Sequence, residues 1–192
     1  MTTQSESLWH LFPDWLPAER ADQLLLTLCS ELAWQQPSIQ LYGKIHPIPR
    51  LQVWMGDSDS QYRYSGKYFE PEPWHHEIVK IRQYIAEQTG WLANSVLINL
   101  YRNGEDKMGW HSDDEPELGP EPRILSLSLG ASREMALRKK GQTRTSHLIS
   151  LNHGDLVEML PGCQTHWQHS IPPRKRVTTP RINLTFRQIN PQ

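Results

Sequence analysis

The strongest constraint on the fold is a two-residue alternation in the segment Arg-Ile-Asn-Leu-Thr-Phe-Arg, residues 181–187. Successive side chains of a β-strand point to opposite faces, so a strand here has one apolar and one polar face. The apolar face carries Ile182, Leu184 and Phe186, and the polar face carries Arg181, Asn183, Thr185 and Arg187. The segment therefore predicts a strand between a hydrophobic core and a polar environment. An edge strand with an ordinary polar outer face is the alternative.

Short apolar or β-branched runs fill the chain from Ser95 onward, and turn-forming pairs such as Asn-Gly and Lys-Gly separate them. Regularly spaced short strands with turn signals are typical of a β-sandwich or jelly roll. The predicted strands are 95–101, 123–129, 134–139, 147–151, 155–160 and 181–189.

Two helices are predicted before these strands. Residues 17–33 and 73–89 each repeat leucine or isoleucine at helical spacing, behind Pro17 and Pro73 respectively. Residues 36–70 are rich in Pro, Gly, Tyr and Asp, which favours hairpins and loops. We expect one α+β, mainly β domain. Its predicted parts are residues 1–94, with the buttressing helices, and residues 95–190, the jelly-roll core, within a single domain 1–192.

The charge of the chain does not by itself predict a nucleic-acid partner, because the formal net charge is only -1. Basic residues nevertheless gather in the C-terminal half, in Arg138-Lys139-Lys140 and Arg174-Lys175-Arg176. These runs form either a local basic face or ordinary surface charges.

The sequence shows no membrane span, secretory signal or disulfide framework. No apolar run reaches the length of a membrane helix, and the first residues lack the pattern of a signal peptide. Cys29 and Cys163 have no metal-binding spacing and are expected to be buried small side chains. We expect a protein that is not secreted, cytoplasmic in a bacterium or nuclear in a eukaryote.

His111 and Asp113 are candidate metal ligands, because side chains at i and i+2 of a strand share a face. Two imidazoles and a carboxylate form the facial ligand set of non-haem Fe(II) oxygenases. A hydrogen-bonded surface pair is the alternative for a lone His-x-Asp. The third ligand stays open at this point among His147, His153, His166 and His169.

The polar face of residues 181–187 predicts an anionic ligand, because two arginines facing inward need negative charge to offset their desolvation. Arg181 and Arg187 are separated by ~20 Å at ~3.3 Å per residue, so each could hold a different end of a ligand, or one could hold a structural acid. A small dicarboxylate suits this arrangement. Asn99 and Tyr101 share a face of the 95–101 strand and could contribute further hydrogen bonds.

Four blocks in order carry a resemblance to a known family: Asn99-x-Tyr101, Gly109-Trp110-His111-Ser112-Asp113-Asp114-Glu115, His166-Trp167-Gln168-His169-Ser170 and Pro180 to Arg187. Together they resemble the AlkB family of Fe(II)/2-oxoglutarate-dependent dioxygenases, most closely its members that repair alkylated bases in duplex DNA. The resemblance runs from about Tyr42 to Ile189. It implies a double-stranded β-helix, the form of jelly roll found in that family.

The resemblance also implies residue roles. It makes His111, Asp113 and His169 the Fe(II) ligands. It assigns 2-oxoglutarate to Asn99, Tyr101, Arg181, Asn183, Thr185 and Arg187, with Arg181 at the distal carboxylate and Arg187 nearer the metal.

For the substrate, the resemblance points to the N-terminal part. Residues 62–66 match a substrate lid, in which Tyr64 would stack on a flipped base against the ring of His111, although Phe or Trp is commoner there. Packing in the core is the alternative for Tyr42 and Tyr62. The substrate-binding residues implied by the resemblance are Tyr42, Gly43 and Lys44 in a hairpin, Arg50, then Tyr62, Tyr64 and Ser65 in the lid, and Asp114 and Glu115 near the base edge.

The expected activity is oxidative demethylation of 1-methyladenine and 3-methylcytosine type bases in DNA. It would consume 2-oxoglutarate and O2, and release succinate and formaldehyde. The expected partner is duplex DNA with a flipped base, with RNA as a further possibility, and the expected protein is a monomer that does not contact membranes. The alternatives are the same chemistry on RNA, a free base or a protein, and a non-catalytic nucleic-acid-binding module.

Overall fold

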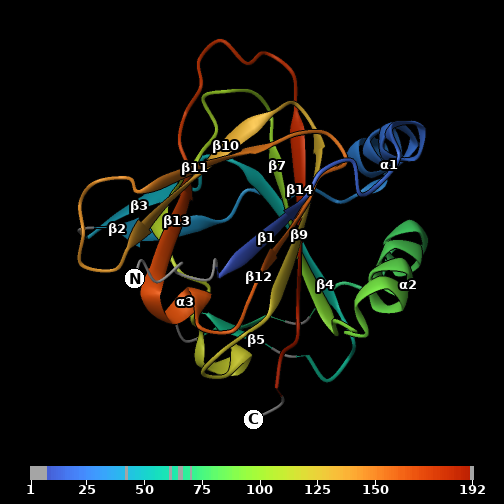
Figure 1. Cartoon of the computed structure of the whole chain (residues 1–192), viewed down its shortest axis with the longest axis horizontal. Helices are drawn as coiled ribbons and strands as arrows, with labels where there is room; N and C mark the ends of the chain where they lie inside the picture. The colour runs from blue at the N-terminus through green and yellow to red at the C-terminus, as the bar shows by residue number, and fades with distance from the viewer. Residues whose placement is uncertain (1–7, 42, 61, 65–66, 70, 191–192) are drawn as a thin grey trace, which may run out of the picture.

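The computed structural model describes residues 8–41, 43–60, 62–64, 67–69 and 71–190, with the backbone alone for residues 41, 62–64 and 67–69. Two antiparallel sheets face each other, one of six strands in the order β1-β12-β9-β14-β7-β4 and one of four in the order β11-β10-β13-β8 (Figure 1). This is the double-stranded β-helix expected. The six-stranded sheet consists of β1 (Trp9–Phe12), β4 (Leu51–Gly56), β7 (Ser95–Tyr101), β9 (Ile124–Gly130), β12 (Leu156–Met159) and β14 (Arg181–Arg187). The four-stranded sheet consists of β8 (Met108–His111), β10 (Arg133–Lys139), β11 (His147–Leu151) and β13 (Trp167–Ile171).

The two predicted helices pack on the outer face of the six-stranded sheet as α1 (Ala18–Glu31) and α2 (His76–Thr89). Helix α2 begins three residues later than Pro73 predicts. His75 has extended backbone angles there, and its side chain accepts a hydrogen bond from the N–H of Glu77, which caps the helix. The helix ends before Gly90, whose φ of 66° closes it in the left-handed conformation.

Strand β14 occupies the middle of the larger sheet, between β7 and β9. The predicted alternation is confirmed, because Ile182, Leu184 and Phe186 are fully buried in the cluster that joins the sheet to the two helices. The opposite face of β14 is turned toward the four-stranded sheet. A second apolar cluster lies between the sheets, so the interior polar groups of β14 are enclosed by hydrophobic side chains.

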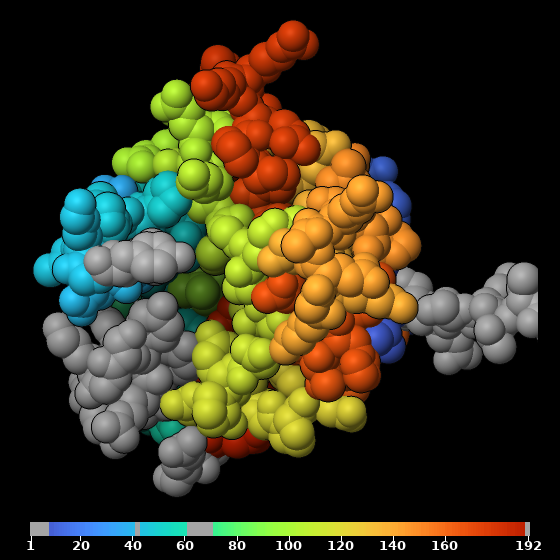
Figure 2. All heavy atoms as spheres, turned by 90° about the vertical axis from the view of Figure 1, so that its left-hand side faces the viewer, coloured from blue at the N-terminus to red at the C-terminus, as the bar shows by residue number. Residues whose placement is uncertain are grey.

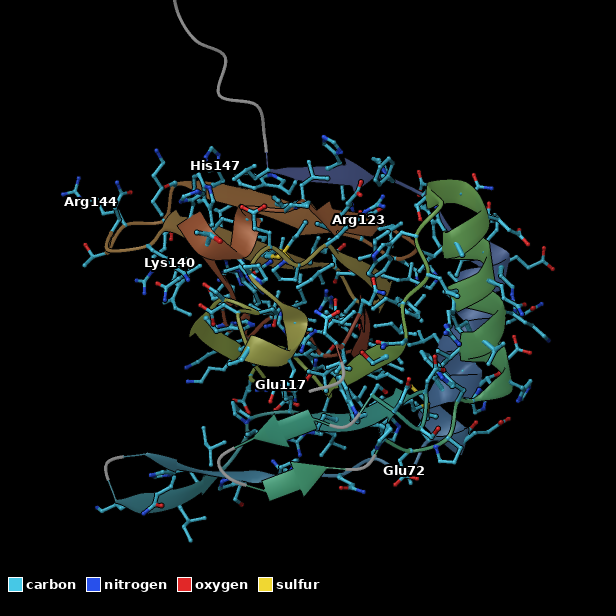
Figure 3. The ribbon with its side chains drawn as sticks, turned by 90° about the horizontal axis from the view of Figure 1, so that it is seen from below. Glu72, Glu117, Arg123, Lys140, Arg144 and His147 are labelled. Carbon is cyan, nitrogen blue, oxygen red and sulfur yellow. The ribbon has the colours of Figure 1, made fainter. Side chains whose placement is uncertain are left out.

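Two small hairpins complete the N-terminal part, as the composition of residues 36–70 predicts. They are β2 (Ser38–Leu41) with β3 (Lys44–Pro47), and β5 (Tyr62–Tyr64) with β6 (Lys67–Phe69). Figure 3 shows both hairpins on the same side of the molecule, away from the outer surface of the two long helices. The remaining short elements are the 3-10 helix Pro116–Leu118 and the single turn α3 (Cys163–His166). Among the described residues, no helix has the length and hydrophobicity to cross a membrane.

Candidate metal and co-substrate site

Strands β8 and β13 bring two histidines together. His111 ends β8 and is paired in register with His169 of β13, and Asp113 follows two residues after His111. Nε2 of His111 lies 3.9 Å from Oδ1 of Asp113, and Nε2 of His169 lies 3.7 Å from Oδ2. The ligand atoms of the three residues are all within 4.8 Å of one another, so a single metal ion can bind all three.

The other three candidate histidines lie elsewhere. The ring of His147 packs against Trp9 at 5.2 Å between centroids. Nδ1 of His153 accepts the N–H of Gly130 at 2.8 Å, and His166 is exposed at the end of α3. The structure therefore leaves His169 as the histidine that completes the set with His111.

The protonation states suit a metal. Burial lowers the pKa of His169 from 6.5 to about 3, so its imidazole is neutral at physiological pH and offers a lone pair. Nδ1 of His111 lies 2.8 Å from the carbonyl oxygen of Gly109. Because a carbonyl only accepts, Nδ1 carries the proton, and the lone pair is on Nε2, which faces Asp113.

Asp113 is held by an arginine of the polar strand. Nη2 of Arg187 donates to its Oδ1 at 2.6 Å, and both side chains are buried. Burial alone raises the pKa of Asp113, but the positive charge of Arg187 brings it below its ordinary value. The carboxylate is therefore ionised and ready to bind a cation.

Arg181, at the other end of β14, is 1% exposed. Its Nη2 donates to Ser128 Oγ and to Asn183 Oδ1, both at 2.8 Å. Its Nε and Nη1 find no hydrogen-bond partner within the described part of the chain. Burial lowers the pKa of Arg181 to about 10, so it stays charged at neutral pH. A buried cation with two spare N–H groups fits a carboxylate ligand.

One pocket joins the metal residues to the polar strand. It is lined by His111, Asp113 and His169, by the polar residues Asn99, Tyr101, Ser126, Asn183, Thr185 and Arg187, and by the apolar residues Met108, Met135, Leu151, Met159 and Ile171. Arg181 is not in the lining itself, because the ring of Tyr101 lies against it, 5.3 Å from its Cζ. The donor set fits Fe(II) with a dicarboxylate: two imidazoles and an ionised carboxylate lie at one end of the pocket. Behind Tyr101 lies a buried guanidinium whose Nε and Nη1 have no hydrogen-bond partner among the described residues.

From the sequence, we did not identify Ser126 and Ser128 of the neighbouring strand β9 as part of the site. Ser126 of β9 donates to Oδ1 of Asn183 at 2.9 Å, and Asn183 in turn donates through Nδ2 to Thr185 at 2.7 Å. With Ser128, these bonds fix the side chains of β14. The signal was present in Leu-Ser-Leu-Ser-Leu, residues 125–129, where an alternation of serine with leucine marks a strand that faces a polar interior.

The predicted substrate residues are only partly described. Tyr42 and Ser65 lie outside the described residues, and for Tyr62 and Tyr64 the backbone alone is described, as strand β5. Gly43 and Lys44 belong to the β2–β3 hairpin, where Lys44 is exposed. Figure 2 looks onto this face, with the hairpin in cyan at the left.

The remaining predicted substrate residues contact the protein itself. Nε of Arg50 donates to Oδ1 of Asn99 at 2.8 Å, so the side chain is directed toward strand β7. Asp114 forms an exposed ion pair with Lys140 of the segment after β10, at 2.7 Å. Oε1 of Glu115 lies 4.0 Å from Nη1 of Arg187, at the edge of the metal site. Their contacts with substrate stay predictions.

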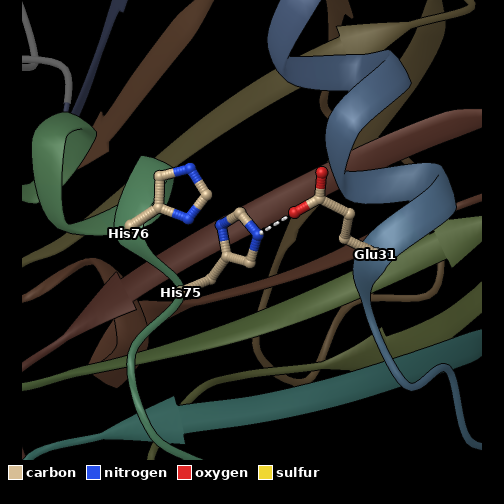
Figure 4. Close-up of side chains that lie close together, drawn as sticks. All are labelled: Glu31, His75 and His76. Carbon is tan, nitrogen blue, oxygen red and sulfur yellow. Dashed lines mark hydrogen bonds and ion pairs between the residues drawn. The ribbon is translucent and has the colours of Figure 1, made fainter.

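A second group of possible ligands, Glu31, His75 and His76, lies between the two long helices (Figure 4). Nε2 of His75 is 2.9 Å from Oε2 of Glu31, and its Nδ1 accepts the N–H of Glu77. Because Nδ1 is the acceptor, the proton of the neutral ring is on Nε2, where a metal would need a lone pair. The contact between His75 and Glu31 therefore links the end of α1 to the start of α2, and the tautomer of His75 argues against a metal site here.

Comparisons with known proteins agree with this geometry. The model of a family described as "2OG-Fe(II) oxygenase superfamily" matches residues 9–187. Mouse "DNA oxidative demethylase ALKBH2" is 43% identical over 160 residues, covering 80% of this chain and 67% of that protein. Human "Alpha-ketoglutarate-dependent dioxygenase alkB homolog 3" is 39% identical over 190 residues, covering 94% of this chain and 66% of that protein. The chain thus spans about two thirds of the length of these relatives.

A solved structure, "The structure of OsALKBH1", has the same fold, with a TM-score of 0.67, 18% identity, and coverage of 94% of this chain and 97% of that chain. At this identity the likeness supports the double-stranded β-helix alone.

Proposed function

The chain belongs to the AlkB family of the 2OG-Fe(II) oxygenase superfamily, and from this we propose that it removes alkyl groups oxidatively from damaged bases in DNA. The observation that carries the proposal is the shared pocket, in which the paired strands β8 and β13 place the metal residues beside the polar face of β14. The co-substrate would be 2-oxoglutarate, with O2.

His111, Asp113 and His169 would hold Fe(II) on one face. When bound together, Fe(II), 2-oxoglutarate and O2 supply the oxidising chemistry that hydroxylates an N-methyl group, with succinate and formaldehyde as products. The residues themselves act by placement. His169 presents a neutral nitrogen, His111 turns its Nε2 toward Asp113, and Asp113 contributes the negative charge that would offset the cation.

Arg181 would bind the distal carboxylate of 2-oxoglutarate through the N–H groups that have no partner among the described residues. Ser128 and Asn183 fix its guanidinium in advance. The ring of Tyr101 beside the guanidinium and the methionines of the pocket would displace water from a dicarboxylate bound here, and this would strengthen each charged contact.

The substrate would be a base turned out of the helix. An N-methyl group on the pairing edge is unreachable inside a duplex, and a lesion that blocks pairing lowers the cost of flipping. In the proposal, Tyr64 stacks on the flipped base, and Asp114 and Glu115 contact the edge of that base. Tyr42 fills the gap that the flipped base leaves in the duplex. Lys44 and the basic run 174–176 would bind phosphates, since they are exposed or partly exposed.

The test is succinate and formaldehyde release on oligonucleotides that contain 1-methyladenine or 3-methylcytosine. His111→Ala should abolish release, whereas His166→Ala, which changes an exposed histidine of the same part of the chain, should leave it near wild type. The absence of iron-dependent turnover on every methylated strand would rule out demethylation. Tyr42→Ala should impair duplex repair more than single-strand repair. Equal losses would argue against the proposed role of Tyr42 in filling the gap that the flipped base leaves in the duplex.

The formal net charge of -1 is the observation behind a second candidate, the same chemistry on RNA, a free base or a protein side chain. Matched RNA and DNA oligonucleotides distinguish the two. Faster turnover on RNA, with DNA binding that is weak and insensitive to salt, would favour this alternative over the DNA substrate.

A further inference from the structure

Gln164 is a buried amide behind the metal residues, and the proposed reaction gives it no role. It is 1% exposed and lies in the single turn α3. Its Oε1 accepts the backbone N–H of Asp113 at 2.9 Å, and its Nε2 donates to the sulfur of Met159 at 3.3 Å. Gln164 therefore contacts the backbone of a predicted metal ligand directly.

The contact with Asp113 fixes the orientation of this amide. A backbone N–H only donates, so the oxygen of Gln164 must face Asp113 and the nitrogen must face Met159. A thioether is a weak acceptor, so the stronger of the two bonds is the one to Asp113. The hydrogen bond with Asp113 therefore fixes the orientation of the Gln164 amide, and the same bond holds the backbone of Asp113 in place.

Asp113 needs such a contact because it lies beyond the end of a strand. β8 ends at His111, and the pairing of β8 with β13 runs from Met108 to His111. In the described chain, the N–H of Asp113 is hydrogen-bonded to Gln164 rather than to a strand neighbour. The sheet thus positions His111, and a side chain positions Asp113.

Gln164 also belongs to the segment that carries the other ligand. Helix α3 leads directly into β13, which begins at Trp167 and contains His169. The hydroxyl of Ser112 donates to the carbonyl of Trp167 at 2.8 Å and forms a second tie between the same two segments. The hydrogen bond of Gln164 therefore links the loop of Asp113 to the start of the strand of His169.

We propose that Gln164 is a positioning residue that presets the distance between Asp113 and His169 for metal binding. The inference rests on the proposed metal site. Partners that orient the ligands of a metal, without touching the metal, commonly set its affinity. Loss of the amide would leave the N–H of Asp113 buried without an acceptor and would free the loop to move.

The experiment titrates metal-free protein with Co(II) alone and follows both affinity and the visible absorption bands of the ion. Gln164→Met keeps the size of the side chain and removes the acceptor. Gln36→Met is the control for the same substitution at an exposed glutamine, whose amide donates to a backbone carbonyl, Ile48 O at 2.9 Å, far along the chain from the ligands. We expect Gln164→Met to bind Co(II) about 10-fold more weakly or worse, with altered bands, and Gln36→Met to match wild type.

A purely structural role would lower the stability of Gln164→Met in urea without changing the affinity or the spectrum of the folded protein, and that result would overturn the inference while leaving the proposed function intact. Failure of the wild type itself to bind Co(II) would overturn the metal site and the inference together. If Gln164→Met does not fold, Gln164→Asn, whose amide is one methylene too short to reach Asp113, takes its place with the same expected results.

Discussion

Nη2 of Arg187 donates to Oδ1 of Asp113 at 2.6 Å, so a residue of the polar strand holds the carboxylate of the metal set. The two residues are 74 positions apart in sequence. The pair connects the six-stranded sheet to the loop after β8 and therefore couples the polar strand β14 to the candidate metal residues. Arg187 thus contacts an acid of the protein in this structure, and its predicted contact with 2-oxoglutarate stays a prediction.

Replacement of Arg187 by Met should destabilise the metal-free protein. Removal of one partner from a buried ion pair leaves a charge uncompensated and costs about 3–5 kcal/mol. Urea unfolding of metal-free wild type and variant measures this difference. Co(II) should recover part of the loss, because the ion supplies positive charge to Asp113. Equal unfolding free energies would mean that the pair contributes nothing to stability.

Replacement of Arg181 by Met should weaken the binding of 2-oxoglutarate and leave the affinity for the metal unchanged. Hydrogen bonds to a charged group contribute about 1.5–3 kcal/mol each, so the loss of the carboxylate contact should raise the dissociation constant by roughly 10-fold to 100-fold or more. Equilibrium dialysis with Co(II) present measures it. Ser128→Ala, which removes one of the acceptors of Arg181, should give a smaller change in the same direction. A loss of Co(II) affinity in Arg181→Met would show that the two ends of the pocket are not independent.

Local patterns predicted six strands of the two main sheets, the two helices and the faces of β14, because each depends on neighbours within a few residues. Strands β1, β4, β8 and β13 were not among the predicted segments. They could not choose His169 among four histidines, since that choice depends on the register between β8 and β13, which is set by the whole sheet. The delayed start of α2 depends on the side chain of His75 replacing a helical hydrogen bond. Local sequence patterns could not predict the proposed role of Gln164 for the same reason, because its partner Asp113 is distant in the chain.

Metal addition should raise the thermal stability of the wild type through the site of His111, Asp113 and His169 alone. An ion that binds only the folded protein stabilises it by about 2.7 kcal/mol at a hundredfold excess over its dissociation constant. Differential scanning fluorimetry with and without Co(II) should show a rise in Tm. His169→Ala should lose this rise, and His76→Ala, in the other histidine cluster, should keep it. Loss of the rise in His76→Ala would mean that the helix contact of Figure 4 binds metal after all.

Acid should weaken the contact between α1 and α2 through Glu77. Hydrogen bonds from Lys80 and Arg20 lower the pKa of Glu77 from 4.5 to about 2. Because the pKa is lower in the folded state, the stabilisation is complete above pH 4.5 and is lost as the pH falls from about 4.5 toward 2. Urea unfolding at pH 7 and pH 3 should therefore show a smaller loss of stability in Glu77→Gln than in wild type. Glu87→Gln changes an exposed carboxylate of the same helix and serves as the control, with the wild-type loss expected. If Glu77→Gln lost as much stability as wild type over this interval, the ion pairs of Glu77, of which the one with Arg20 joins the two helices, would contribute nothing at neutral pH.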